Sequence, residues 1–258
     1  DVYKRQAIYV QQFLCDLREP LDISAFVGAW EQLVERHAVL RTSFAWEGLE
    51  TPVQIVHPSV KVPLVHLEWR SFAVSEQEIK REEYLQTDRQ SGIHFLEAPL
   101  FRLALFRLNE AHYQLLWTSH HALLDGRSRL ILLEELFEIY EALCDGRAPT
   151  LGPPVDYRGF VDWLQAQDVE ASGPFWRKLL AGYDQPTFLN VGIQRLNDPK
   201  QTHALASQGQ HLSAAFSDSL RNLASEHGLT LNTLFQGAWA ILLSRYCGCL
   251  LYTSPSPR

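Results

Sequence analysis

The spacing of apolar residues near the N-terminus predicts an amphipathic helix that runs to about His37. Its apolar positions recur every three or four residues and so share one face. Asp22 or Ser24 precedes them and is placed to cap the helix. The apolar positions are Phe26, Trp30, Leu33 and Val34.

A second, polar helix is predicted to run to about residue 89. Ser75 and Glu78 are spaced as a capping box at its start. Between the two helices, stretches rich in β-branched and aromatic residues indicate short strands. These strands are expected at residues 39–46, 53–57 and 64–69.

The middle of the chain predicts a hairpin followed by a strong helix. Residues 101–108 and 113–120 read as its two strands, and the second is apolar on both faces near its start. Such a strand is typical of the centre of a sheet that is covered on both sides. The helix is expected from about Ser128 to Cys144, with Gly146 ending it.

The rest of the chain predicts mainly helices. Trp30, Tyr157 and Trp163 are expected in the core. Because helices and strands alternate, the fold class is α/β (α+β). Helices are expected at 157–167, 174–180, 217–227 and 230–246, with one strand near 206–212.

Composition excludes several function classes. The 258 residues carry a net charge of −7, and no cluster of Lys and Arg indicates a nucleic-acid partner. No apolar run approaches the roughly 18 residues that a membrane span requires. The four cysteines are scattered and form no zinc-binding pattern. We therefore expect a cytoplasmic protein with reduced thiols, without nucleic-acid or membrane partners.

Both ends of the chain differ from their surroundings. DVYKRQ at residues 1–6 and the last residues, 249–258, match translations of one sequencing adapter read at the two ends of a DNA fragment. We expect them to be artefacts and exclude them from the fold.

The polar segment HHALLDG, residues 120–126, lies between the predicted buried strand and the predicted helix. Adjacent strand residues point to opposite faces. Only one of His120 and His121 can therefore face a given cavity, and the pair is not expected to bind one metal ion. Imidazole is suited to proton transfer near neutral pH. The segment points to acid–base chemistry, with a purely structural histidine as the alternative.

Asp125 and Gly126, at the end of the segment, are expected to support the imidazole. Asp125 is placed to brace the loop through backbone hydrogen bonds or an arginine partner, and Gly126 permits a positive φ or a close backbone approach. The sequence GRSR, which starts at Gly126, lacks the second glycine of a serine nucleophile elbow. No phosphate-binding glycine loop is present. Glu134 and Glu135 are interpreted as a solvated helix edge.

HHALLDG resembles the HHxxxDG signature of condensation domains of nonribosomal peptide synthetases. Chloramphenicol acetyltransferases and related acyltransferases share its HxxxDG core. The resemblance covers nearly all of residues 7–248. Further segments agree in order and spacing: ERHAVLRTSF at 35–44 with RHxxLRTxF, YRGFVDW at 157–163 with the family's tyrosine and tryptophan motif, and FWRKL at 175–179 with FWxxxL.

The chain also departs from the family pattern. The family's first motif survives only as a fragment near residues 11–14. Arg127 follows the glycine where many members carry an aromatic or aliphatic residue. The late motifs of the second lobe are absent.

The resemblance implies two chloramphenicol acetyltransferase-like lobes with a tunnel between them. The first lobe, residues 7–180, would be nearly complete, and residues 181–248 would begin the second. Donor and acceptor carrier proteins would present thioesters on phosphopantetheine arms, and an adenylation domain would adjoin in the full-length synthetase. The domain itself would bind no cofactor or metal. The 258-residue chain alone is expected to be inactive.

The resemblance also assigns roles to individual residues. The second histidine of the pair faces the tunnel in this family, which makes His121 the catalytic residue and His120 a packed neighbour. Asp125 would form a buried pair with an arginine, for which Arg41 and Arg36 are the candidates. Gly126 would supply the turn into the helix.

Three alternatives to peptide-bond formation stay open on the sequence. The chain is also compatible with an HxxxDG acyltransferase that makes an ester or lipid conjugate, with an epimerisation domain, or with a non-catalytic carrier-protein docking module. A heterocyclisation domain is disfavoured because it replaces the histidine pair with aspartates.

Overall fold

The computed structural model describes residues 9–182 and 209–247. The chain divides after Ala166 into two compact units. The segments 1–6 and 249–258, for which the sequence predicts adapter translations, lie outside the described residues.

The first unit is built on a four-stranded mixed sheet in the order β1-β6-β5-β4. Strands β4 and β5 pair in parallel, and the other neighbours pair antiparallel. Strand β6 is buried from Tyr113 to His120, which confirms the predicted hairpin and the predicted central strand. The strands are β1 (Val10–Leu17), β4 (Leu64–Glu68), β5 (Phe101–Asn109) and β6 (His112–His120).

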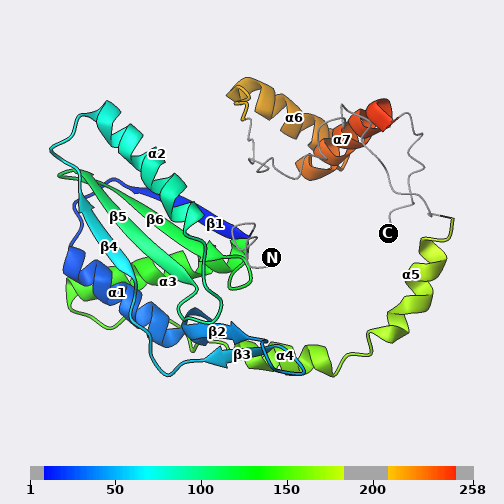
Figure 1. Cartoon of the computed structure of the whole chain (residues 1–258). Helices are drawn as coiled ribbons and strands as arrows, with labels where there is room; N and C mark the ends of the chain where they lie inside the picture. The colour runs from blue at the N-terminus through cyan, green and yellow to red at the C-terminus, as the bar shows by residue number, and fades with distance from the viewer. Residues whose placement is uncertain (1–8, 183–208, 248–258) are drawn as a thin grey trace, which may run out of the picture. The chain divides into compact units, whose positions relative to one another are not determined.

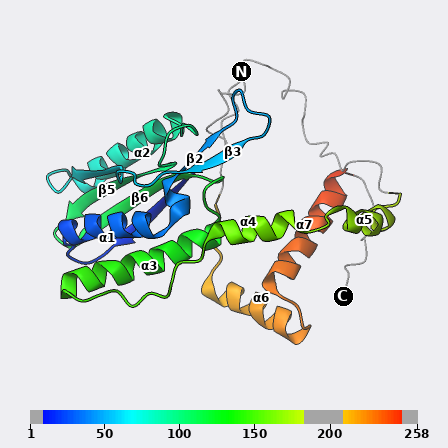
Figure 2. The same cartoon turned by 90° about the horizontal axis from the view of Figure 1, so that it is seen from below.

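Helices cover both faces of this sheet. Helices α1 (Ile23–Arg36) and α3 (Gly126–Asp145) lie side by side on one face, and α2 (Val74–Gln90) lies on the other (Figures 1 and 2). The predicted cap of α1 is confirmed at Asp22, whose Oδ1 accepts a hydrogen bond from Ala25 N at 3.0 Å.

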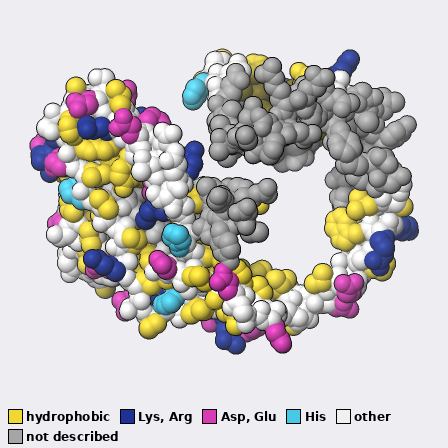
Figure 3. Space-filling model, viewed as in Figure 1, with side chains coloured by type: hydrophobic (Ala, Val, Ile, Leu, Met, Phe, Trp, Pro, Cys, Tyr) yellow, Lys and Arg dark blue, Asp and Glu magenta, His cyan; other side chains and the backbone are white. Residues whose placement is uncertain are grey.

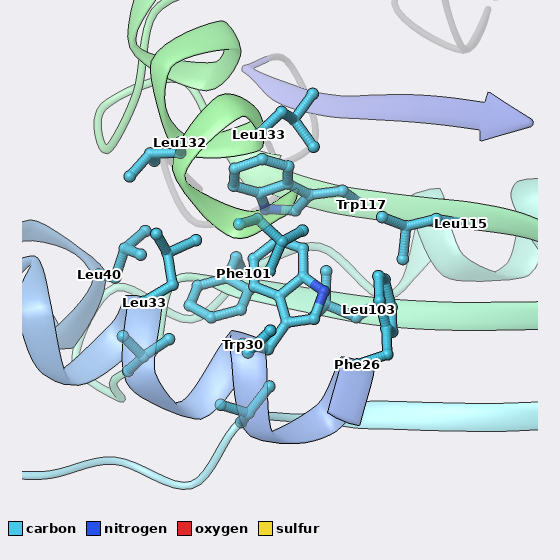
Figure 4. Close-up of a cluster of buried hydrophobic side chains, with 14 of the residues drawn as sticks. Phe26, Trp30, Leu33, Leu40, Phe101, Leu103, Leu115, Trp117, Leu132 and Leu133 are labelled. Carbon is cyan, nitrogen blue, oxygen red and sulfur yellow. The ribbon is translucent and has the colours of Figure 1, made fainter. Parts of the chain in front are cut away.

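The main core lies between the sheet and the α1–α3 pair (Figure 4). Trp30 of α1 is fully buried and meets Trp117 of β6 edge to face, with ring centres 5.0 Å apart. Phe101 of β5 stacks on Trp30 at 6.1 Å and also meets Trp117 edge to face at 6.5 Å. Burying a large apolar side chain contributes about 1.5–3 kcal/mol to the stability of the fold. These rings therefore fix the C-terminal half of β6 against α1 and β5.

A buried polar network attaches α2 to the opposite face. The Asp88 carboxylate accepts hydrogen bonds from Gln12 Nε2 at 2.7 Å and Thr118 Oγ1 at 2.6 Å, and it pairs with Arg102. These partners stand on β1, β6 and β5 respectively. One carboxylate therefore joins α2 to three strands.

The capping box predicted at Ser75 is wrong. Helix α2 begins at Val74 after Ala73, which makes no side-chain cap, so Ser75 lies inside the first turn. The start is fixed instead by Gln77, whose Nε2 donates to the carbonyls of Trp69, Phe72 and Leu108 at 3.0–3.2 Å. Contacts distant in sequence override the local capping signal here.

The smaller elements largely follow the sequence pattern. A 3-10 turn at Ala38–Arg41 precedes the two-stranded sheet of β2 (Thr42–Ala45) and β3 (Val53–Val56). The strand expected near 206–212 falls partly outside the described residues, and residues 209–212 form none. The remaining helices are α4 (Tyr157–Gln165) in the first unit, and the 3-10 turn Glu170–Ser172, α5 (Gly173–Leu179), α6 (Ala214–Glu226) and α7 (Leu231–Cys247) in the second.

Two residues expected in the core lie at the surface. Tyr157 and Trp163 of α4 are 57% and 56% exposed, whereas Trp30 is buried as predicted. Hydrophobic side chains are visible at the surface over α4 and α5 (Figure 3). Apolar periodicity marks a helix face, but it does not determine whether another element covers that face.

Glu135 is not the solvated helix edge that the sequence indicated. Its carboxylate lies 2.7 Å from Arg36 Nε and 2.6 Å from His37 Nε2, which connects α3 to the end of α1. Burial alone would raise the pKa of Glu135, but the hydrogen bonds and charges of His37 and Arg36 outweigh it and lower that pKa.

This cluster predicts a loss of stability in acid. Because the folded pKa of Glu135 lies below its unfolded value, near 4.3, its contribution is complete above that value. The contribution is lost as the pH falls through the folded pKa. Glu135→Gln should lower stability near neutral pH and flatten the pH dependence below about pH 4. Urea unfolding of both proteins across this range is the measurement, and equal pH slopes would contradict the assignment.

Among the helices of residues 9–182 and 209–247, none is long and apolar enough to span a bilayer. Within the same residues, no three His, Cys, Asp or Glu side chains gather where they could hold a metal ion.

Candidate functional site

The HHALLDG segment joins the end of β6 to the start of α3. The β1–β6 pairing continues past the strand end, because His121 N donates to Tyr9 O at 2.9 Å. Leu123 and Leu124 are buried in the main core. The segment is therefore held at both ends and by its two leucines.

His120 is a buried residue with a packed ring. It is 5% exposed, and its ring centre lies 4.4 Å from that of Phe95. Its Nδ1 accepts a hydrogen bond from Ala122 N at 3.0 Å. Burial, followed by the charge of His121, lowers the pKa of His120. The ring is therefore held neutral and its Nδ1 is occupied.

His121 is exposed, and its tautomer is fixed by the loop. Its Nδ1 lies 2.7 Å from Leu124 O. A carbonyl oxygen can only accept, so Nδ1 carries a hydrogen, and in the neutral ring the lone pair is therefore on Nε2. Orienting one imidazole nitrogen in this way leaves the other available as a proton acceptor. The arrangement suits His121 to general-base chemistry at Nε2, and its catalytic role stays a prediction.

Asp125 does not form the buried pair with an arginine that the sequence predicted. It is exposed and caps α3, with Oδ1 accepting from Ser128 N at 2.7 Å and Ser128 Oγ at 2.6 Å. The Ser128 side chain, followed by its backbone, lowers the pKa of Asp125. Gly126 is the first residue of α3, without a positive φ and with open space where a Cβ would lie. Its expected special backbone role is therefore not found.

The two candidate arginine partners of Asp125 are used elsewhere. Arg36 pairs with Glu135, as described above. Arg41 donates to the carbonyls of Val34 at 3.0 Å and Glu35 at 3.3 Å. These carbonyls belong to the last turn of α1, where the helix dipole and unpaired oxygens favour a cation.

The capping role of Asp125 predicts a stability effect. Asp125→Ala removes the acceptor of both Ser128 hydrogen bonds, so we expect a lower Tm and a moderate loss of turnover as the loop loosens. Asp125→Asn should keep most of the stability because asparagine caps equally well. Thermal melts and turnover assays check this. An unchanged Tm with abolished turnover would instead give the carboxylate a direct chemical role.

The sequence offered Asp125 backbone hydrogen bonds, and the one from Ser128 N is found, but sequence reasoning identified neither the helix cap nor the aromatic neighbour of His120. An Asp three residues before a Ser, directly ahead of an apolar helical pattern, is the signal that could have identified the cap. No local signal points to Phe95, because it meets His120 only through the fold.

Known proteins are similar to this chain over nearly its whole length. The family model "Condensation domain" matches residues 1–249. A linear gramicidin synthase protein of Brevibacillus parabrevis is 39% identical over 242 residues, which is 93% of this chain and 5% of that protein. Chondramide synthase cmdD of Chondromyces crocatus is 39% identical over 243 residues, which is 93% of this chain and 6% of that protein.

Solved structures show the same fold. The first condensation domain of the CDA synthetase matches with a TM-score of 0.76 and 21% identity, over 94% of this chain and 58% of that chain. SgcC5 from Streptomyces globisporus matches with a TM-score of 0.72 and 22% identity, over 94% of this chain and 55% of that chain. The chain thus spans less than two thirds of the relatives that it matches. Fold and family model agree with the resemblance seen in the sequence, and the chain belongs to the condensation domain family.

Proposed function

We propose that this chain takes part in amide-bond formation between two thioester-bound substrates in nonribosomal peptide synthesis. The observation that carries the proposal is the exposed His121 imidazole, whose Nδ1 is committed to Leu124 O at 2.7 Å. Its Nε2 is left to accept a proton from a substrate amine.

One nitrogen, His121 Nε2, handles the proton that the reaction moves. The α-amine of the acceptor attacks the thioester carbonyl of the donor, and a C–N bond forms. His121 Nε2 accepts the amine proton, or stabilises the charged tetrahedral species as it forms. The C–S bond then breaks, and the leaving thiolate takes up the proton. Holding two tethered substrates in line supplies much of the rate.

The proposed partners are a donor and an acceptor carrier protein, each with a phosphopantetheine arm, and an adjacent adenylation domain. Support comes from the relatives, which are synthases many times longer than this chain. The phosphopantetheine belongs to the carriers rather than to this domain.

Mass spectrometry of loaded carriers tests the proposal. Donor and acceptor carriers are mixed with the gene product that contains this chain, and the acceptor arm is analysed for a new amide. If the product is an ester or a lipid conjugate, the chain belongs to an HxxxDG acyltransferase instead. If the donor is epimerised and no amide forms, it belongs to an epimerisation domain. Carrier binding without any product would leave a docking module.

A further inference from the structure

Arg129 follows the HHALLDG segment by three residues, and its side chain reaches from α3 back over β1 and β6. Its Nη2 donates to Gln11 Oε1 at 2.8 Å and lies 3.4 Å from Ser119 Oγ. The guanidinium carbon lies 5.5 Å from the ring centre of Phe13 and 5.7 Å from that of Trp117. Two aromatic rings and two polar groups thus fix the guanidinium.

The contact with Ser119 relates the Arg129 guanidinium to the candidate catalytic imidazole. Ser119 precedes His121 by two residues, and the backbone pairing of His121 with Tyr9 extends the strand geometry to it. Residues two apart on a strand share a side, with Cα atoms about 7 Å apart. The guanidinium, which contacts Ser119, therefore lies on the side of β6 from which His121 projects.

Within residues 9–182 and 209–247, the structure places no counter-charge beside Arg129. Its guanidinium contacts no carboxylate or main-chain carbonyl of the described residues, and its buried Nε has no acceptor. Burial lowers the pKa of Arg129, so the charged form is disfavoured here. In the same unit the partly buried Arg36, Arg102 and Arg107 pair with carboxylates, and Arg41 donates to main-chain carbonyls. A partly buried charge that no carboxylate offsets is costly even with a hydrogen bond to Gln11, which favours a role in ligand binding.

We propose that Arg129 binds an anionic oxygen of the acyl substrate beside His121. This rests on the amide-forming function proposed above and adds a second substrate-binding group to it. The oxygen has two sources, a carboxylate carried by a substrate or the oxyanion that develops on the thioester carbonyl during attack. The contacts with Phe13 and Trp117 orient the guanidinium without neutralising it, so its charge stays available for either oxygen.

Three variants test the proposal. Arg129→Met removes the charge and the donors at similar length, and Arg129→Lys keeps the charge. Arg127→Met is the matched control, because Arg127 is an exposed arginine in the first turn of the same helix. We expect Arg129→Met to melt at or above the wild-type Tm, because it removes a partly buried charge that no carboxylate of the described residues offsets.

Two measurements separate the sources. Calorimetry on the 258-residue chain compares hydrolysis-resistant succinyl- and butyryl-pantetheine analogues. If the oxygen belongs to a substrate carboxylate, wild type should bind the succinyl probe about tenfold more tightly than the butyryl probe. Arg129→Met should then lose this preference, and Arg129→Lys should keep part of it. Single turnover in the gene product that contains the chain uses neutral donors. If the oxygen is instead the oxyanion of the thioester carbonyl, neither probe should be preferred. Arg129→Met should then lower the rate of amide formation by about 100-fold or more, with KM unchanged.

Either measurement can contradict the Arg129 proposal. If Arg129→Met keeps the wild-type affinities and rate, or if Arg127→Met loses as much, the assignment of Arg129 is wrong. If the wild-type protein forms no amide, the proposed function fails and the calorimetry alone decides. Equal affinity of wild type for both probes would then overturn the Arg129 proposal as well.

Discussion

Replacement of His121 by alanine is expected to slow amide formation by about 100- to 10,000-fold, the usual effect of losing a positioned general base. The fold should tolerate the change, because the His121 ring is exposed and its side chain bonds only to Leu124 O of its own loop. Carrier affinity should also stay near wild type. Single-turnover amide formation from preloaded carriers, with Tm and carrier affinity in parallel, is the measurement.

His120→Ala is the matched control for this prediction. The His120 ring packs against Phe95 and accepts a hydrogen bond from Ala122 N, so its loss should lower Tm more than it lowers the chemical rate. If His120→Ala lost the activity while His121→Ala kept it, the assignment of the two rings would be inverted. Full activity in both variants would remove the histidine mechanism altogether.

The second large effect is expected on stability. Asp88→Ala should destabilise the fold by about 3–5 kcal/mol, the cost of removing one partner of a buried charge pair. It leaves Arg102 without its carboxylate and the fully buried Thr118 hydroxyl without its acceptor. Urea unfolding measures the loss. Glu82→Ala, an exposed change on the same helix, should stay within about 0.5 kcal/mol.

A double variant sharpens this test. Asp88→Leu combined with Arg102→Met removes both charges together, so it should be more stable than either single variant, because no buried charge is left alone. Single-variant losses that simply add would show that the two side chains do not depend on each other. That result would contradict the network seen in the structure.

The local pattern predicted the elements that carry the site. Helical spacing placed α1 and α3 within a few residues of their ends, and the run of apolar residues marked β6 as a central strand. Strand alternation indicated that His120 and His121 face different surroundings, and in the structure one is buried and the other exposed. These features depend on neighbours a few residues apart, which the sequence displays directly.

Partners that lie far apart in the chain could not be predicted in this way. The sequence suggested Arg36 or Arg41 as the partner of Asp125. In the structure each arginine has other partners, and Asp125 bonds to Ser128. Nothing near Asp88 in the sequence indicates that Gln12, on strand β1, is bound to it. Charged side chains are numerous, and only the packing of helices on the sheet selects which of them meet.

The first strand, β1, was not predicted, but the sequence by itself indicated the order of the helices and strands from residue 22 to residue 180, the family and the histidine segment, because periodicity and a short motif are local properties. Tertiary structure alone decided that His120 packs on Phe95, that Asp88 binds Gln12, and that Arg129 lies over β1 and β6 away from every carboxylate of the described residues. The physical reason is that hydrogen bonding and desolvation depend on the atoms that packing brings within a few ångströms. Those atoms are set by the whole fold rather than by the neighbouring residues.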